Sequence, residues 1–443
     1  SKRLLVSKKN FDFFFPDLNI EYFDILKSID DLVKERPSVG GFGINGPFIY
    51  SENPILMNKK YKIEDFIIDE EKYIEDFNNS KLKLRLNTPI AIVAVFTNKC
   101  STNCIYCYAP KKKTKEMSLD KWGSIIQEMK ELNIERIILD NGDIGFREDK
   151  IDFLELLLKH DMIFSISTKG YFSDYEVSRL IDNGYCKLIN NSIKRNVQLS
   201  IDAIDDDILS FMTKNINFKS EIIETYKNFY KRGIIPKIKA VLTPYNIKQI
   251  PKIVDFFYDI GARKFEFVKY MRSFYRHNDN LFLSNDHIKI IDNHINNIII
   301  KYPEIEIHCD IRTKQLYFPD IDPNNKLELW KNRSGCSGGW TTLGIAADGS
   351  AFLCEQAPLI EDFIVGNLKE NSIKEIWDSD RLKKFIFTDK NKFSGTVCYE
   401  CHEFEECHWS IGYCYRDSYF SYGTKYDAPP MCPMQSKPGL RLT

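Results

Sequence analysis

Three cysteines stand close together at Cys100, Cys104 and Cys107, with the spacing Cys-x3-Cys-x2-Cys. They directly follow the apolar run at residues 90–96, which predicts a buried strand. The three thiols are therefore expected in a loop at the carboxyl end of that strand. Three thiolates can hold three irons of a [4Fe–4S] cube and leave the fourth iron open. An open iron can chelate a small molecule through an amine and a carboxylate.

Zinc and a disulfide are the other interpretations of this motif. A structural zinc site needs four ligands, and no fourth Cys or His lies within thirty residues of the loop. A disulfide leaves one of the three thiols unpaired. Twelve cysteines in a chain without an evident secretion signal also indicate metal or redox chemistry. The sequence therefore favours an iron–sulfur cluster, with zinc left open.

An aromatic residue, Tyr106, stands directly before the third cysteine. With it, the motif resembles that of the radical SAM superfamily, whose members carry this spacing and an aromatic residue at that position. The resemblance implies that the open iron binds S-adenosylmethionine (SAM). It also implies that Cys100, Cys104 and Cys107 are the catalytic cluster ligands and that Tyr106 lies at the cofactor.

Composition limits the possible partners. The chain has 443 residues, 43% of them hydrophobic, which is enough for two or three domains. Its formal net charge of -1 argues against a nucleic-acid partner. No apolar run approaches a membrane span, and the first residues lack the apolar core of a signal peptide. We therefore expect a cytoplasmic protein that binds neither nucleic acid nor membrane.

Predicted strands and helices alternate from about residue 89 to residue 270. Such alternation indicates an α/β fold with a parallel sheet, covered by helices and functional at its carboxyl edge. Six units are too few for a closed eight-stranded barrel, so we expect an open, partial (β/α)6 barrel. The expected strands are residues 90–97, 136–140, 162–168, 197–202, 237–242 and 264–269, and the expected helices are residues 118–132, 150–160, 174–183, 220–231 and 247–258.

The chain divides into four expected parts. Residues 1–88 predict an N-terminal α+β module, which could bind a leader peptide as in many peptide-modifying relatives. Residues 89–270 form the radical SAM partial barrel. Residues 271–335 are a bridging region with an expected helix at 286–300 and an expected strand at 304–309. Residues 336–443 form a cysteine-rich C-terminal domain.

Polar residues follow the expected strands where SAM is expected to bind. Residues 141–143 take the place of the Gly-Gly-Glu that holds the SAM amino group in the resembling family. The match departs from the family, since an asparagine replaces the first glycine and an aspartate the glutamate. The same residue types are also common in ordinary turns at strand ends. The expected SAM contacts are Tyr106, Asn141, Gly142, Asp143, Thr168, Ser200 and Asp202.

Seven cysteines gather between residues 336 and 432. The first two flank a predicted hairpin with its turn at residues 347–350. Gly-x4-Cys followed by Cys-x2-Cys-x5-Cys resembles the SPASM domain of peptide-modifying radical SAM enzymes. One gap departs from it, because six residues separate Cys407 from Cys414 where three are usual. Zinc is again the alternative, since Cys-x2-Cys is also a zinc knuckle.

The SPASM resemblance implies two further [4Fe–4S] clusters, and so three clusters in all. One predicted set is complete, with Cys398, Cys401, Cys407 and Cys432. The other set has three members, Cys336, Cys354 and Cys414. Its fourth ligand is either Cys309 or absent, which leaves an open iron.

Together the resemblances imply a radical SAM maturase of ribosomally made peptides. Such an enzyme cleaves SAM reductively, removes a hydrogen atom from a precursor peptide and installs a thioether or C–C crosslink. It draws electrons from an external donor such as flavodoxin or ferredoxin. Two alternatives stay open. One is an anaerobic sulfatase-type maturase that oxidises Cys or Ser to formylglycine, and the other is a non-catalytic metal-binding scaffold.

Overall fold

The structure is a computed structural model. It describes residues 39–43, 46–50, 85–110, 115–188, 195–309, 311, 326–327, 330, 333 and 335–441. The expected N-terminal module therefore lies outside the described residues, except for residues 85–88 and the antiparallel hairpin of β1 (Val39–Gly43) and β2 (Gly46–Tyr50). Leader-peptide binding by that module stays a prediction.

Alternating strands and helices form an α/β core, and all six predicted strands are present. The strands are β3 (Ala91–Ala94), β4 (Arg136–Leu139), β5 (Ile166–Thr168), β6 (Val197–Ser200), β7 (Lys237–Leu242) and β8 (Lys264–Lys269). The helices between and after them are α5 (Leu119–Glu131), α6 (Lys150–Lys159), α7 (Asp174–Asp182), α8 (Asp206–Thr213), α9 (Phe218–Tyr230) and α10 (Ile250–Asp259). Helix α8 is the one element among these that the sequence pattern does not predict.

Helix α5 illustrates how the local sequence sets these elements. Ser118 caps its N-terminus, because the Ser118 side chain accepts a hydrogen bond from a backbone N–H in the first turn. Trp122, Ile125, Ile126 and Met129 recur at helical spacing and are buried. The cysteine loop is therefore fixed at both ends, by β3 before it and by α5 after it.

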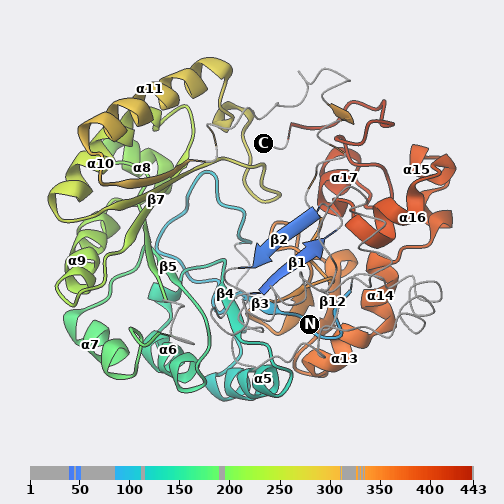
Figure 1. Cartoon of the computed structure of the whole chain (residues 1–443), viewed down its shortest axis with the longest axis horizontal. Helices are drawn as coiled ribbons and strands as arrows, with labels where there is room; N and C mark the ends of the chain where they lie inside the picture. Colours follow the sequence, from blue (N-terminus) through green and yellow to red (C-terminus); the bar gives the residue numbers. More distant parts are fainter. Residues whose placement is uncertain are drawn as a thin grey trace, which may run out of the picture.

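The strands form a parallel, curved sheet. Strand β3 pairs with β4, and β5 to β8 pair in sequence order, all in parallel. A parallel bridge between Arg136 and Ile163 links the two groups of strands. Figure 1 shows the helices along the outside of this curve. All the carboxyl ends of the strands therefore meet on one rim.

Two more parallel strands extend the barrel beyond the six predicted units. After α11 (Asn285–Lys301), β9 (Glu306–Cys309) pairs with β8. Strand β10 (Thr342–Ile345) pairs with β3 on the opposite side. Because β10 belongs to the cysteine-rich region, this pairing places that region directly on the barrel sheet.

The predicted C-terminal hairpin is confirmed. Strand β10 pairs antiparallel with β11 (Ser350–Phe352), which pairs antiparallel with β12 (Ile364–Asn367). Gly349 in the turn has φ 91°, a conformation that favours glycine. Short helices follow, on the opposite side of Figure 1 from α9 and α10. They are α13 (Ile373–Asp378), α14 (Asp380–Ile386), α15 (Val397–Glu400), α16 (Phe404–Glu406) and α17 (Tyr415–Tyr422).

In the part of the chain that the structure describes, no helix is both long and apolar enough to cross a membrane.

Candidate active site

A cavity of about 450 Å³ lies at the carboxyl ends of the parallel strands. Its wall is built by loops that follow β3, β4, β5 and β6, with further residues from β7 and β8. Every residue expected in the triad or at SAM lines this one cavity: Cys100, Cys104, Tyr106, Cys107, Asn141, Gly142, Asp143, Thr168, Ser200 and Asp202.

Hydrogen bonds stabilise the cysteine loop internally and attach it to α8. Thr102 Oγ1 lies 3.2 Å from Cys100 Sγ and 3.3 Å from Cys104 Sγ. The backbone N–H groups of Asn103 and Ile105 donate to the carbonyl oxygens of the last two residues of α8, at 2.8 and 2.9 Å. The unpredicted helix α8 therefore positions the loop.

The triad supplies three thiols from one loop. Burial raises the pKa of all three thiols, and the charge of Cys104 raises that of Cys107 further. Each cysteine of an iron–sulfur cube binds its own iron through a thiolate, so these side chains are the donor type that a cluster needs. Among the described residues, no three His, Cys, Asp or Glu side chains converge on one metal-ion position.

The loop at residues 141–143 packs tightly beneath the triad loop. Asn141 and Gly142 both have positive φ, 53° and 58°. A Cβ on Gly142 would lie 1.8 Å from the carbonyl oxygen of Thr97. Only glycine therefore fits this position, while Asn141 is among the residue types that tolerate the left-handed conformation.

The Asp143 carboxylate is buried and joins the loops after β4 and β5. Its Oδ1 accepts hydrogen bonds from the Thr168 hydroxyl and from the Gly145 N–H, and its Oδ2 accepts one from the Lys169 N–H at 2.6 Å. Burial raises the pKa of the Asp143 carboxyl, and these hydrogen bonds oppose that shift. Asp143 thus organises the predicted SAM site in addition to lining it.

A second buried carboxylate, Asp202, collects donors from three elements. The Tyr106 hydroxyl donates to Asp202 Oδ2 at 2.5 Å, Lys169 Nζ lies 3.3 Å from the same oxygen, and the Val241 N–H donates to Oδ1 at 3.1 Å. Lys169 Nζ also contacts the carbonyl oxygen of Ser200 at 3.4 Å. The aromatic residue of the triad motif is therefore tied to the end of β6.

Four of the C-terminal cysteines form one group in space. Burial and the charges of neighbouring thiols raise the pKa of Cys398, and they raise that of Cys407 to about 12. Burial also raises the pKa of Cys432, with a further contribution from Cys401. The members are Cys398, Cys401, Cys407 and Cys432, which is the complete set expected from the sequence.

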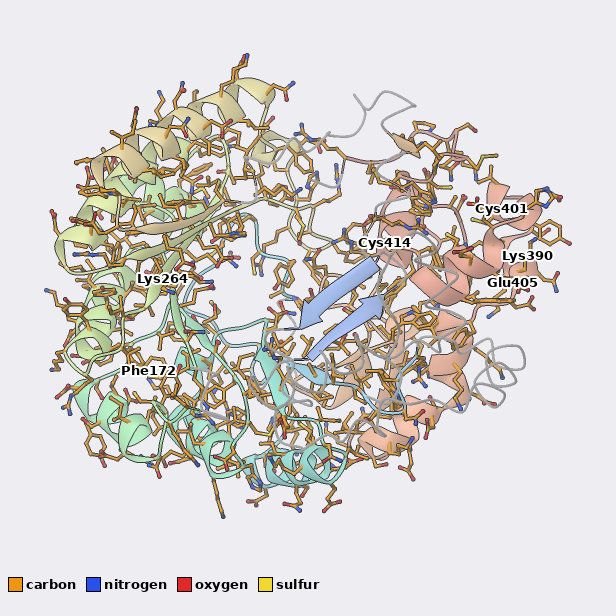
Figure 2. All side chains as sticks on the ribbon, viewed as in Figure 1. Phe172, Lys264, Lys390, Cys401, Glu405 and Cys414 are labelled. Carbon is orange, nitrogen blue, oxygen red and sulfur yellow. The ribbon has the colours of Figure 1, made fainter. Side chains whose placement is uncertain are left out.

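The other three, Cys336, Cys354 and Cys414, form a second group. After burial, the charge of Cys336 raises the pKa of Cys354, and that of Cys354 raises the pKa of Cys414. In the described part of the chain, no fourth cysteine is among the groups that shift these pKa values most. Figure 2 shows Cys414 nearer the middle of the molecule than Cys401, which lies at the rim.

A π-helical turn at Cys407–Ile411 lies where the gap to Cys414 is longer than usual. A π-helical turn accommodates an extra residue within a helix. Gly412 follows with φ 81°, and a Cβ there would lie 3.0 Å from Cys336 Cβ. The longer gap therefore forms a local bulge beside the second cysteine group.

The loop after Cys354 connects this second group to the cavity. Gln356 lines the cavity, and the Arg416 guanidinium donates to Gln356 Oε1. Arg416 also pairs with Asp417 at 2.6 Å. The charges of Cys414 and Cys354 contribute to the raised pKa of Arg416. The predicted auxiliary site thus adjoins the predicted SAM site.

Two family models match the two regions that carry these cysteine groups. The radical SAM superfamily model matches residues 94–257, from the end of β3 to α10. The model of the SPASM iron–sulfur cluster-binding domain matches residues 336–402. The chain therefore carries a radical SAM domain and a SPASM domain.

Curated relatives of this radical SAM protein are distant. The PqqA peptide cyclase of Bradyrhizobium diazoefficiens is 21% identical over 40% of this chain and 46% of the relative. The probable GTP 3′,8-cyclase of Methanopyrus kandleri is 21% identical over 40% and 55%. The PqqA peptide cyclase of Gluconobacter oxydans is 19% identical over 78% and 90%. The match therefore spans about half the length of the first two relatives and most of the third.

Solved structures share the fold. SuiB of Streptococcus suis bound to precursor peptide SuiA has a TM-score of 0.62 at 16% identity, covering 95% of this chain and 88% of SuiB. The structure of anSMEcpe with bound AdoMet has a TM-score of 0.50 at 16% identity, covering 72% and 88%. At such identities the likeness establishes the architecture, which confirms the predicted barrel and C-terminal SPASM domain.

Several cavity residues of this radical SAM protein belong to no recognisable motif. Asp140 and Lys169 adjoin predicted residues, so their positions next to strand ends could have indicated them. Tyr108 follows the triad by one residue. Lys239 lies inside β7 and Gln356 in the SPASM loop, and neither carries a sequence signal.

Asp140 lowers the stability of the folded protein by an amount that depends on pH. Burial and the charge of Glu355 raise the pKa of Asp140 from 3.8 to about 6. Between these values the folded protein binds more protons than the unfolded chain, so stability falls as the pH rises through this window. At pH 7 we expect the unfolding free energy of Asp140→Asn to exceed that of the wild type by roughly 1–3 kcal/mol. Its melting temperature should be higher as a result. The gap should close towards pH 4, and a pH-independent gap would contradict this assignment.

Proposed function

We propose that this radical SAM protein modifies a ribosomally made precursor peptide by abstracting a hydrogen atom from it. The supporting observation is that one cavity gathers the triad, the expected SAM residues and the SPASM loop at Gln356. With a reduced cluster and SAM bound, the cofactor supplies a 5′-deoxyadenosyl radical that takes the hydrogen atom. The protein binds and orients both reactants.

The roles of the cavity residues follow from their contacts. The buried Asp143 is the partner for the SAM ammonium group, with Asn141 and Gly142 shaping the loop around it. Asp202 fixes Tyr106 and Lys169 on the opposite side of the site. These groups would hold SAM in one orientation within the cavity.

Names of relatives support a peptide as the substrate. PqqA peptide cyclase and SuiB bound to precursor peptide SuiA are both named for a peptide. We infer that this chain likewise acts on a precursor peptide and joins two of its residues by a thioether or a C–C bond. Forming such a bond from two bonds to hydrogen releases two protons and two electrons in all. One proton and one electron leave together as the abstracted hydrogen atom. The second proton would go to solvent, and the second electron would need an acceptor, which an auxiliary cluster held by the SPASM cysteines could supply.

The proposed electron flow involves three [4Fe–4S] clusters and an outside donor. Cys100, Cys104 and Cys107 would hold the cluster that a flavodoxin or ferredoxin reduces, and the two SPASM cysteine groups would hold clusters able to accept electrons from the substrate. The number of cysteines in each spatial group supports this division. Cysteines reserved for clusters also fit the reducing cytoplasm, where we place the protein.

Anaerobic reconstitution with a candidate peptide tests the proposal. Candidate peptides are those encoded by any short reading frame found beside the gene. We expect about twelve irons per chain for three cubes, 5′-deoxyadenosine in the presence of SAM and reductant, and a peptide lighter by two hydrogens. Absence of 5′-deoxyadenosine with full iron content favours the metal-binding scaffold.

The anaerobic sulfatase-type maturase is the second candidate, supported by the shared fold with anSMEcpe. It oxidises a Cys or Ser to formylglycine instead of joining two residues. Peptide mass spectrometry separates the two candidates, because formylglycine forms at one residue and reacts with hydrazine reagents, whereas a crosslink joins two residues and does not.

Cys309 decides whether the second SPASM cluster has an open iron. It lies at the end of β9, whereas Cys336 and Cys354 flank the C-terminal hairpin and Cys414 lies at the N-terminus of α17. We therefore expect Cys309→Ala to keep the iron content and cluster spectrum of the wild type. An open iron could then hold a substrate thiolate, since metal binding keeps a thiol deprotonated. Loss of about four irons per chain would instead make Cys309 the fourth ligand.

A further inference from the structure

One carboxylate oxygen of Asp140 has no hydrogen-bond partner of good geometry among the described residues, although the neighbouring Asn141 N–H helps to lower the pKa of the carboxyl group. The Tyr108 hydroxyl donates to Asp140 Oδ1 at 2.8 Å, which holds the carboxyl group in one orientation. The other oxygen, Oδ2, is buried and has no hydrogen-bond partner in the described part of the chain. Both residues line the cavity. A buried acceptor left unpaired is costly, above all when it is charged, so a bound ligand is the expected donor.

Three cations that line the cavity form ion pairs with other carboxylates. Lys239 lies near enough to lower the pKa of Asp140 but makes its ion pair with another carboxylate. The pairs are Lys169 with Asp202 at 3.3 Å, Lys239 with Glu266 at 3.2 Å and Arg272 with Asp279 at 2.7 Å. None of these three contacts supplies the missing donor to Oδ2.

Asp140 and Asp143 lie three positions apart and contact different walls of the cavity. Asp143 is bonded to Thr168 at the end of β5, in the predicted SAM site. Asp140 is bonded to Tyr108 and is influenced by the charge of Glu355, which belongs to the SPASM loop. Asp140 therefore belongs to the side that the SPASM loop adjoins, away from the predicted ammonium contact.

We propose that Asp140 is a specificity-determining residue whose Oδ2 accepts a hydrogen bond from an N–H or O–H group of the peptide substrate. The proposal rests on the peptide-maturase function above and names the chemistry that the site selects. A carboxylate favours a donor side chain, such as a hydroxyl, amide or ammonium group, beside the reacting carbon. It disfavours an acidic residue at that point, because two carboxylates repel each other.

Asp140→Ala separates peptide recognition from SAM binding. We expect the KM for the precursor peptide to rise tenfold to a hundredfold, as for a lost hydrogen bond to a charged group. The Kd for SAM alone, measured by equilibrium titration, should stay within twofold. Asp182→Ala, at an exposed carboxylate on α7, is the matched control and should leave both values unchanged. Asp140→Asn gives the same two readouts if the alanine variant does not fold.

A double-mutant cycle with single-alanine peptides identifies the donor. One peptide position should raise KM for the wild type and have no further effect in Asp140→Ala, because contacting residues are not additive. Additive effects at every position would overturn the proposal. A tenfold weaker affinity for SAM with an unchanged peptide KM would also overturn it and assign Oδ2 to SAM. If the wild type forms 5′-deoxyadenosine but modifies no peptide, the maturase function itself is refuted, and this role of Asp140 with it.

Discussion

Replacing Cys100, Cys104 and Cys107 together by alanine abolishes the formation of 5′-deoxyadenosine. These thiols line the cavity with the expected SAM residues, and without them no cluster can deliver an electron to SAM. We expect the variant to lose about four irons per chain and to keep the SPASM clusters, because their cysteines form separate groups. Chromatography after anaerobic reduction with SAM measures the nucleoside.

Cys186→Ala is the matched control for the triad variant. Cys186 has an exposed side chain. Partial loss of solvent around the thiol raises its pKa, and no other cysteine contributes to that shift. It should keep both the iron content and the rate of the wild type. If the triple variant still forms 5′-deoxyadenosine at the rate of the wild type, the three cysteines do not hold the cluster that reduces SAM.

Asp143→Ala weakens SAM binding more than it harms cluster assembly. Losing the carboxylate from a buried partner of an ammonium group costs about 2–5 kcal/mol, which corresponds to at least roughly a thirtyfold higher Kd for SAM. The triad cysteines lie on a different loop, so the iron content should stay near that of the wild type. Equilibrium titration with SAM and iron analysis give the two quantities.

Internal contacts of Asp143 require a control for folding. Asp143 also accepts hydrogen bonds from Thr168, Gly145 and Lys169, so the alanine variant could lose order in the β5 loop. The melting temperature and the cluster absorbance report such a loss. Asp207→Ala, at an exposed carboxylate on α8, should leave SAM affinity unchanged. A normal affinity in Asp143→Ala moves the ammonium contact elsewhere, with Asn141 as the next candidate.

Local patterns predicted the barrel well because strand burial and helix periodicity are properties of short segments. The six strands and five of the helices between them occur where alternation and apolar spacing place them. The sequence pattern did not predict helix α8, because its residues 206–213 follow a strand without a separate turn signal. Its carbonyl groups nevertheless hold the triad loop, so a short element with a weak pattern has a large effect on the site.

The sequence by itself determined the cysteine chemistry. The spacing around Cys100, the aromatic Tyr106 and the polar residues at the strand ends are all readable along the chain. Parallel strands then bring those ends to one rim, so residues predicted separately line one cavity. This part of the site follows from local order and from the topology that the order implies.

Only the tertiary structure decided how the C-terminal region meets the barrel. Strand β10 pairs with β3 across about 250 residues of sequence, and no local pattern encodes a partner so distant. That pairing places the SPASM loop at the cavity, where Gln356 lines the wall and Glu355 raises the pKa of Asp140. The unpaired Oδ2 of Asp140 likewise arises from neighbours on different elements. Long-range packing, which depends on which surfaces fit together, sets these features.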